Sequence, residues 1–97
     1  MAQVVYSRRA LADLERLADF LREEAPRSAV AAISVIVDGV NILARHPLVG
    51  RRCEPGLREL VISYGKTGYV VLYSLEARED VALILAIRHQ REAGFQE

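Results

Sequence analysis

The chain lacks tryptophan, contains a single cysteine and a single lysine, and carries no formal net charge at pH 7. Cys53 has no second cysteine with which to pair, which fits a reducing compartment, and neither histidine stands at a zinc-ligand spacing from it. With 13 basic and 13 acidic residues, the chain has no positive excess to drive sequence-independent binding to nucleic acid. We therefore expect no metal site, no cofactor and no direct sequence-specific contact with nucleic acid.

Long apolar runs are also missing. The longest, Val81–Ile87 and Ala29–Val37, are far shorter than the roughly 20 residues that a membrane-spanning helix needs. The opening stretch MAQVVYSRRA has no apolar segment after a basic start, as a secretory signal would have. We expect a cytoplasmic protein with no membrane contact. Its length suits one domain, residues 1–97, with a modest core of aliphatic side chains.

Hydrophobic periodicity predicts a strand and two helices in the first half of the chain. Gln3–Tyr6 is expected to be a short strand, and Ser7 is a candidate N-cap for a helix over Arg8–Glu24, where leucines recur at helical spacing. Pro26 separates this helix from a second one over Arg27–Arg45. The two helices are expected to form a hairpin.

The second helix has an unusually wide apolar arc. Such a helix is either buried on more than one side of the core or covered by a partner, and the residues alone allow both. Its buried stripe is expected at Ala29, Ile33, Ile36, Val37, Val40 and Leu43, with Ala32 and Val35 widening the arc.

The second half of the chain predicts a loop and three strands. His46–Gly56 contains two prolines and two glycines and is expected to be a loop. Apolar residues then alternate over Leu57–Tyr64, and further strands are expected at Tyr69–Leu75 and Val81–Ile87. The last of these is apolar throughout, which indicates a strand covered on both faces. The short turns between the strands predict an antiparallel meander.

The predicted order is β-α-α-β-β-β, an α+β fold in which a helical hairpin packs on one face of a small antiparallel sheet. In a meander, the end of the first strand, the start of the second and the end of the third lie at the same end of the sheet. Tyr64, Tyr69 and Arg88 should therefore be neighbours. Arg58, at the start of its strand, should lie at the opposite end.

The stretch AIRHQREAGF (Ala86–Phe95) holds the residues best suited to chemistry. His89 is a candidate general acid or base, with Arg88 and Arg91 as cations, and RNA cleavage through the 2′-hydroxyl needs such a set. A solvated strand end whose charges pair with one another is the alternative. Arg88 and Phe95 are also residue types that dominate protein interfaces, so a docking surface is a further possibility.

Several stretches, in this order, resemble the RelE/ParE superfamily of toxins from bacterial type II toxin–antitoxin pairs. They are ARHPLVGR at the end of the hairpin, PGLRELVI, GYVVLYSL and the terminal ILAIRHQREAGF, after a short strand. Together they span nearly the whole chain, and the last is most similar to the ParE branch. The resemblance implies the RelE-like fold, which matches the order of elements predicted above.

The resemblance implies two alternative activities. ParE-type toxins poison DNA gyrase, whereas RelE-type toxins cut messenger RNA on the ribosome. Here the strand after Gly68 has no basic residue and Phe95 has no hydroxyl, so the ParE-like activity, inhibition of gyrase by protein contact without catalysis, is favoured. The target-binding residues are then expected to be Arg58, Arg88, His89, Arg91 and Phe95.

Two other functions stay open. One is a RelE-like ribosome-dependent endoribonuclease in which His89 and Arg88 are catalytic. The other is a family member that binds its partner but is no longer toxic. All three readings imply a cognate antitoxin, ParD-like or similar, which covers part of the helical hairpin. Its expected contacts are Leu14, Leu17, Leu21, Ile33, Val37 and Val40.

Overall fold

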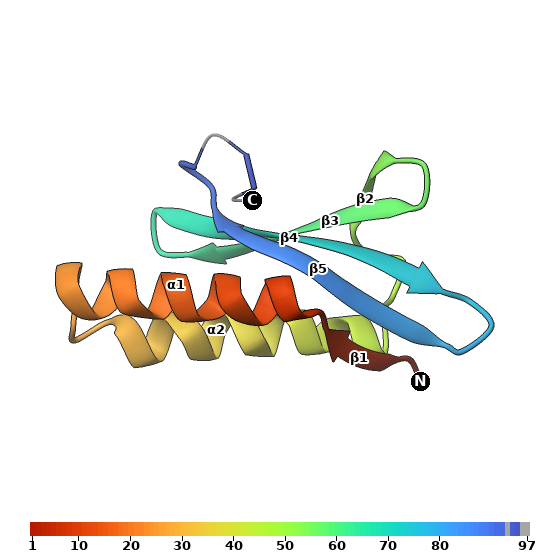
Figure 1. Cartoon of the computed structure of the whole chain (residues 1–97), viewed down its shortest axis with the longest axis horizontal. Helices are drawn as coiled ribbons and strands as arrows, with labels where there is room; N and C mark the ends of the chain where they lie inside the picture. The colour runs from red at the N-terminus through yellow and green to blue at the C-terminus, as the bar shows by residue number, and fades with distance from the viewer. Residues whose placement is uncertain (93, 96–97) are drawn as a thin grey trace.

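Five strands form one sheet in the order β1-β5-β4-β3-β2, and two helices pack on one of its faces (Figure 1). The computed structural model describes residues 1–92, 94 and 95. The helices are α1 (Arg8–Glu24) and α2 (Ala29–Asn41), and a short 3₁₀ turn, η1 (Ile42–Ala44), follows α2. The strands are β1 (Gln3–Tyr6), β2 (Arg51–Glu54), β3 (Leu57–Tyr64), β4 (Thr67–Glu76) and β5 (Val81–His89).

The predicted α+β architecture is confirmed, and local signals account for most element bounds. β1, α1 and β3 begin and end where the sequence pattern places them. Ser7 caps α1, because its Oγ accepts a hydrogen bond from the Ala10 N–H at 3.1 Å. The second helix, expected over Arg27–Arg45, is shorter, because the α-helix ends at Asn41 and the chain continues as the 3₁₀ turn η1.

Two expectations about the sheet are wrong. The sheet is mixed, because β1 pairs in parallel with β5. Strand β2 lies inside His46–Gly56, which was expected to be a loop. Alternation of apolar residues reveals a strand but not its partner, so the parallel pair left no local signal. All four residues of β2 are exposed at the sheet edge, so β2 has no apolar alternation to detect.

The core lies between the helices and the sheet. The two helices cover one face of the sheet (Figure 1). β5 is an interior strand, as its apolar run indicates, although helices cover only one of its faces. No helix in the described part of the chain is long and apolar enough to cross a membrane. The largest fully buried core side chains are Tyr69, Tyr73, Ile36, Leu43, Ile84, Ile87, Val40 and Val71.

Side chains close the edge of β5 where its pairing with β1 ends. The Ile87 N–H donates to Asp13 Oδ2 at 2.8 Å, and the Ile87 carbonyl accepts from Arg16 Nη2 at 3.5 Å. The His89 N–H donates to Glu92 Oε1 at 2.9 Å. Backbone groups that an edge strand leaves open are therefore satisfied from α1 and from the C-terminal turn, residues 90–92. These bonds hold the end of β5, which carries the candidate site, against α1.

Candidate functional site

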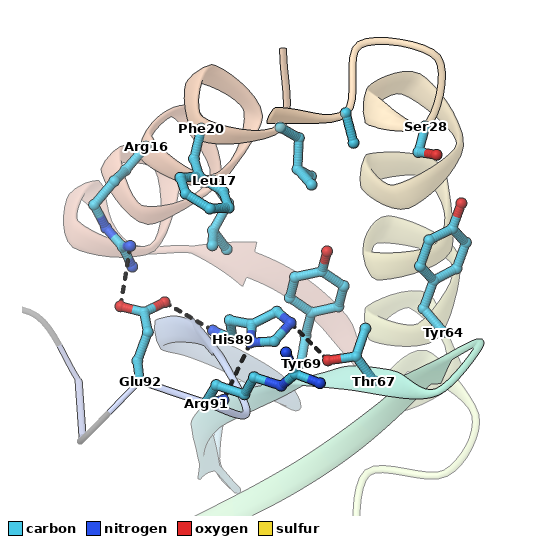
Figure 2. A pocket seen from close by; sticks show the side chains of 12 residues that line it. Arg16, Leu17, Phe20, Ser28, Tyr64, Thr67, Tyr69, His89, Arg91 and Glu92 are labelled. Carbon is cyan, nitrogen blue, oxygen red and sulfur yellow. Dashed lines mark hydrogen bonds and ion pairs between the residues drawn. The ribbon is translucent and has the colours of Figure 1, made fainter. Parts of the chain in front are cut away.

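A pocket of about 650 Å³ opens between the helical hairpin and the sheet (Figure 2). We call it the hairpin–sheet pocket. The C-terminal half of α1 and the turn after it form one wall, and the adjoining ends of β3, β4 and β5 form the other. Its lining is mainly apolar, with polar groups of β4, β5 and the C-terminal turn at one side. The apolar lining includes Leu17, Phe20, Leu21, Ala25 and the rings of Tyr64 and Tyr69.

The meander brings the predicted neighbours to one end of the sheet, as expected. Tyr69 pairs with His89, and Val70 pairs with Arg88. Adjacent residues of a strand point to opposite faces, so His89 faces the helices and the pocket, whereas Arg88 faces the other side of the sheet. Sequence spacing alone grouped these two side chains, and the pleat of the strand separates them.

Both ring nitrogens of His89 are engaged in hydrogen bonds. Nε2 lies 2.6 Å from Thr67 Oγ1, and Nδ1 accepts the Arg91 N–H at 3.1 Å. A nitrogen that accepts a hydrogen bond carries no proton, so Nε2 is the protonated nitrogen and donates to Thr67. The imidazole also packs edge-on against the Tyr69 ring, with 5.4 Å between ring centroids. His89 thus joins β4 to the C-terminal turn.

On the opposite face, Arg88 contacts the C-terminal turn and the Phe95 ring. Arg88 Nη1 donates to the carbonyl oxygens of His89, Gln90 and Glu92 at 3.2, 3.2 and 3.1 Å. Its guanidinium carbon lies 5.1 Å from the centroid of the Phe95 ring, a cation–π distance. Both side chains are therefore used to shape the turn that follows β5.

Arg58 lies at the other end of the sheet, as predicted, and is separated from the other expected target-binding residues. It pairs with Tyr73 across β3 and β4. Its Nη1 donates to the carbonyl oxygens of Leu48 and Gly50 at 3.1 and 2.7 Å. Arg58 therefore holds the loop before β2. The expected target-binding set is divided among this loop, the face that carries Arg88, and the pocket side that carries His89 and Arg91.

Arg91 is the member of that set with an exposed and unpaired charge. Its backbone N–H bonds to His89, but no ion pair with its guanidinium is present among the described residues. Arg16 across the pocket differs, because it lies 3.1 Å from Glu92 Oε2 and 3.7 Å from Asp13 Oδ1. An exposed cation therefore stands beside a largely apolar pocket.

The residues expected to contact an antitoxin have three different environments. Leu17 and Val40 are 3% and 0% exposed, so they belong to the core and offer no surface in this structure. Leu14 and Ile33 are half-buried against the core, and Val37 is also half-buried. Leu21 is half-buried and lines the pocket.

Sequence reasoning missed Phe20, which is 58% exposed and lines the pocket. An aromatic residue outside the leucine stripe of an amphipathic helix was the available signal. Tyr69 Oη also points into the cavity (Figure 2). Burial raises the pKa of the Tyr69 hydroxyl, and the nearby Tyr64 adds to this effect, so the hydroxyl stays protonated. No group of three His, Cys, Asp or Glu residues within the described ranges could hold a metal ion.

Residues 4–94 match the sequence profile of the family described as ParE toxin of type II toxin–antitoxin system, parDE. The chain is similar to toxin RelE3 of Caulobacter vibrioides, with 38% identity over 92 residues that cover 95% of this chain and 98% of RelE3. It is also similar to a solved structure of the chromosomal ParDE system from P. aeruginosa, with 25% identity, a TM-score of 0.74, and coverage of 92% of this chain and 96% of the other. The toxin–antitoxin complex RelBE2 from Mycobacterium tuberculosis gives 28% identity, a TM-score of 0.60 and coverage of 92% and 98%.

Proposed function

Because the chain belongs to the ParE toxin family of type II toxin–antitoxin systems, within the ParE/RelE superfamily, we propose that it acts by binding a target protein and does not cleave RNA. DNA gyrase is the candidate target, from the ParE resemblance of the terminal stretch. A cognate antitoxin neutralises it, as the similarity to structures of toxin–antitoxin systems suggests.

The observation that carries this proposal is the engagement of His89 and Arg88. A general acid or base needs a ring nitrogen free to reach the substrate, and both nitrogens of His89 bond within the chain. A cation that stabilises a phosphate must lie beside the acid–base residue, and Arg88 points to the face of the sheet opposite His89, where its Nη1 donates to three backbone carbonyls. The two residues that an RNA-cleaving site requires here therefore lie on opposite faces of the sheet, and both bond to the C-terminal turn.

Arg91 supports the binding reading. It is exposed, it is unpaired within the described chain, and its backbone is fixed by the bond from its N–H to His89. An arginine on a fixed backbone is a favoured anchor at protein interfaces, because less conformational freedom is lost on binding. We therefore assign Arg91 the leading role in target binding, with His89 as its positioning residue.

The test incubates the purified toxin with DNA gyrase and relaxed plasmid, and resolves supercoiled and cleaved DNA on a gel. We expect loss of supercoiling with trapped cleaved DNA. Arg91→Ala should weaken inhibition about tenfold or more, as loss of an interface anchor does. Arg78→Ala is the matched control, because Arg78 is equally an exposed arginine but lies in the β4–β5 turn at the opposite end of β5.

A ribosome-dependent endoribonuclease is the second candidate, favoured by the RelE name of a relative with 38% identity. A translating extract run in parallel with the gyrase assay detects it through cut messenger RNA. Cut messenger RNA with unaffected gyrase would refute the proposed function. The His89→Ala variant would then be the first to examine.

A further inference from the structure

The loop before β2 exposes two large aliphatic side chains to solvent. Leu48 and Val49 are 64% and 55% exposed, and they are adjacent in the chain. The Val49 N–H donates to the His46 carbonyl at 3.1 Å, which closes a tight turn with Pro47 and Leu48 at its centre. Glycine and short polar residues usually occupy the centre of such a turn, and exposed aliphatic residues usually occur singly. An adjacent aliphatic pair at this place is therefore a candidate contact surface.

Side chains of the sheet fix the shape of this loop. Tyr73 is 0% exposed, and its hydroxyl donates to the Pro47 carbonyl at 2.8 Å and accepts the Gly50 N–H at 2.9 Å. Arg58 Nη1 donates to the carbonyl oxygens of Leu48 and Gly50. The loop backbone is therefore held in one shape before any partner binds. A fixed loop loses less conformational entropy on binding than a free one does.

The surroundings of the aliphatic pair are basic. Residues 45–52 include three arginines and no acidic residue, although the whole chain is neutral. Arg51 pairs with Glu59 at 3.3 Å, whereas Arg45 and Arg52 are exposed and have no ion pair among the described residues. An apolar centre with a polar rim that contains arginine is typical of protein interfaces. The complementary surface has an apolar depression with carboxylates around it.

A protein fits this surface better than a nucleic acid does. Leu48 and Val49 are aliphatic, so they offer no ring on which a base could stack. Glu54 and Glu59 on β2 and β3 place negative charge beside the arginines, which disfavours a phosphate backbone. The neutral total charge also gives no long-range attraction to nucleic acid.

We propose that the loop before β2 is a second contact surface for the target protein, and that Leu48 and Val49 enter an apolar depression rimmed by carboxylates. This inference rests on the proposed function, which places the first anchor at Arg91. The loop lies at the opposite end of the sheet from Arg91, and both surfaces carry unpaired arginines, so one acidic target surface complements both. Arg58 is then a positioning residue, which shapes the loop without touching the target.

The experiment measures two properties of each variant: growth arrest on induced expression in cells without the antitoxin, and affinity of the purified toxin for immobilised DNA gyrase. The double variant Leu48→Ala, Val49→Ala should bind gyrase about tenfold or more weakly and relieve the growth arrest, because it removes apolar contact with the target. Its melting temperature should stay within about 3 °C of the wild-type value, since exposed side chains contribute little to stability. A larger fall would show that the pair stabilises the fold and would contradict the inference.

The double variant Leu11→Ala, Val30→Ala is the matched control. It removes the same side-chain atoms, from residues that are 51% and 81% exposed on α1 and α2. It should change the affinity for gyrase less than about twofold and keep the growth arrest. Equal gyrase affinities of the two double variants would overturn the inference.

The charge of the rim is tested with Arg52→Glu. This variant should bind gyrase more weakly, and the loss should be larger at low salt than at high salt, because screening weakens a rim charge. Arg27→Glu is the control, since Arg27 is also exposed and the change in net charge is the same, but it lies between the two helices. Equal effects of the two variants would show that only the net charge matters, which would contradict an acidic partner at the loop.

The positioning role is tested with Arg58→Ala. Alone, this variant should weaken gyrase binding about threefold or more, because the loop loses its fixed shape. It should have little further effect once Leu48 and Val49 are alanine, since the loop then presents no aliphatic pair. Equal losses in both backgrounds would refute the positioning role.

Parallel measurements separate this inference from the proposed function. If the loop variant keeps its gyrase affinity while Arg91→Ala loses it, the inference is wrong and the proposed function stands. If the loop variant instead weakens only antitoxin binding, self-association or binding of the free toxin to DNA, the loop serves that partner and the inference is again wrong. If the loop variant relieves the growth arrest while wild-type toxin does not bind gyrase, the loop assignment stands and the proposed target is wrong.

Discussion

Asp13 offers the sharpest test of how α1 is joined to the sheet. Asp13 is 5% exposed, and its carboxylate accepts the buried Ile87 N–H at 2.8 Å, across 74 positions of the chain. Asp13→Ala leaves that N–H buried without a partner. A hydrogen bond to a charged group contributes about 1.5–3 kcal/mol, and an abandoned buried donor costs a similar amount. The gain in helix propensity from Asp to Ala offsets at most about 0.7 kcal/mol.

Asp19→Ala provides the matched control for Asp13→Ala. Asp19 lies on the same helix, its side chain is 71% exposed, and among the described residues it pairs with Arg22 alone, at the surface. Both changes bring the same gain in helix propensity, so the difference between them isolates the bond to Ile87. The Asp13 variant should be less stable than the Asp19 variant by about 2–3 kcal/mol. For a domain of this size, that corresponds to a melting temperature roughly 10–20 °C lower.

Urea unfolding of the two variants measures the difference, and amide exchange of Ile87 reports on the bond itself. Exchange at Ile87 should accelerate in Asp13→Ala and stay slow in Asp19→Ala. A stability difference below about 1 kcal/mol, together with a protected Ile87 amide, would show that another group satisfies this N–H. The account of how α1 closes the β5 edge would then be wrong.

Three further predictions concern the loop before β2 and the buried tyrosines. Gly50→Ala should destabilise the fold by about 2 kcal/mol or more in urea unfolding, because the added Cβ would lie 2.5 Å from the Tyr73 hydroxyl and 2.9 Å from the Glu59 carbonyl; unchanged stability would show that the loop can move. Tyr73→Phe should lower the free energy of unfolding by about 1–3 kcal/mol, because the buried Gly50 N–H loses its acceptor, whereas Tyr69→Phe should not lower it. An unchanged free energy of unfolding in Tyr73→Phe would show that the Tyr73 hydroxyl does not stabilise the loop before β2. Burial raises the pKa of the Tyr6, Tyr69 and Tyr73 hydroxyls above the ordinary value of about 10. As the pH rises, the unfolded chain therefore loses these protons at a lower pH than the folded chain does. The free energy of unfolding should be unaffected by these groups below about pH 10 and should fall above it. Urea midpoints that stay constant from pH 9 to pH 11 would refute this last expectation.

The division of the candidate site shows where spacing in the sequence misleads. Arg88 and His89 are adjacent in the chain, yet the strand pleat directs them to opposite faces of the sheet. Arg58 was a candidate because it is also a basic residue, but its guanidinium bonds to the loop before β2, at the other end of the sheet. Residue type alone therefore identified candidates for chemistry, and the hydrogen bonds that they make in the fold assigned most of them to structure.

Local order was determined by the sequence itself. Leucines at helical spacing and the Ser7 cap defined α1, alternation defined β3, and the order of elements predicted a helical hairpin on a sheet. These signals are readable because helix and strand periodicity depend on residues close together in the chain. The family resemblance has the same origin, since it depends on short stretches in a fixed order.

Long-range contacts were decided only by the tertiary structure. Three features join segments that are far apart in the sequence: the parallel pairing of β1 with β5, the edge strand β2, and the bond from Ile87 to Asp13. The local pattern of one segment gives no information about which other segment it contacts. The same holds for the pocket, which Phe20 of α1 and Tyr69 of β4 both line. A pattern of neighbouring residues records which face of an element is apolar, whereas the position of a partner element depends on how all the faces pack together.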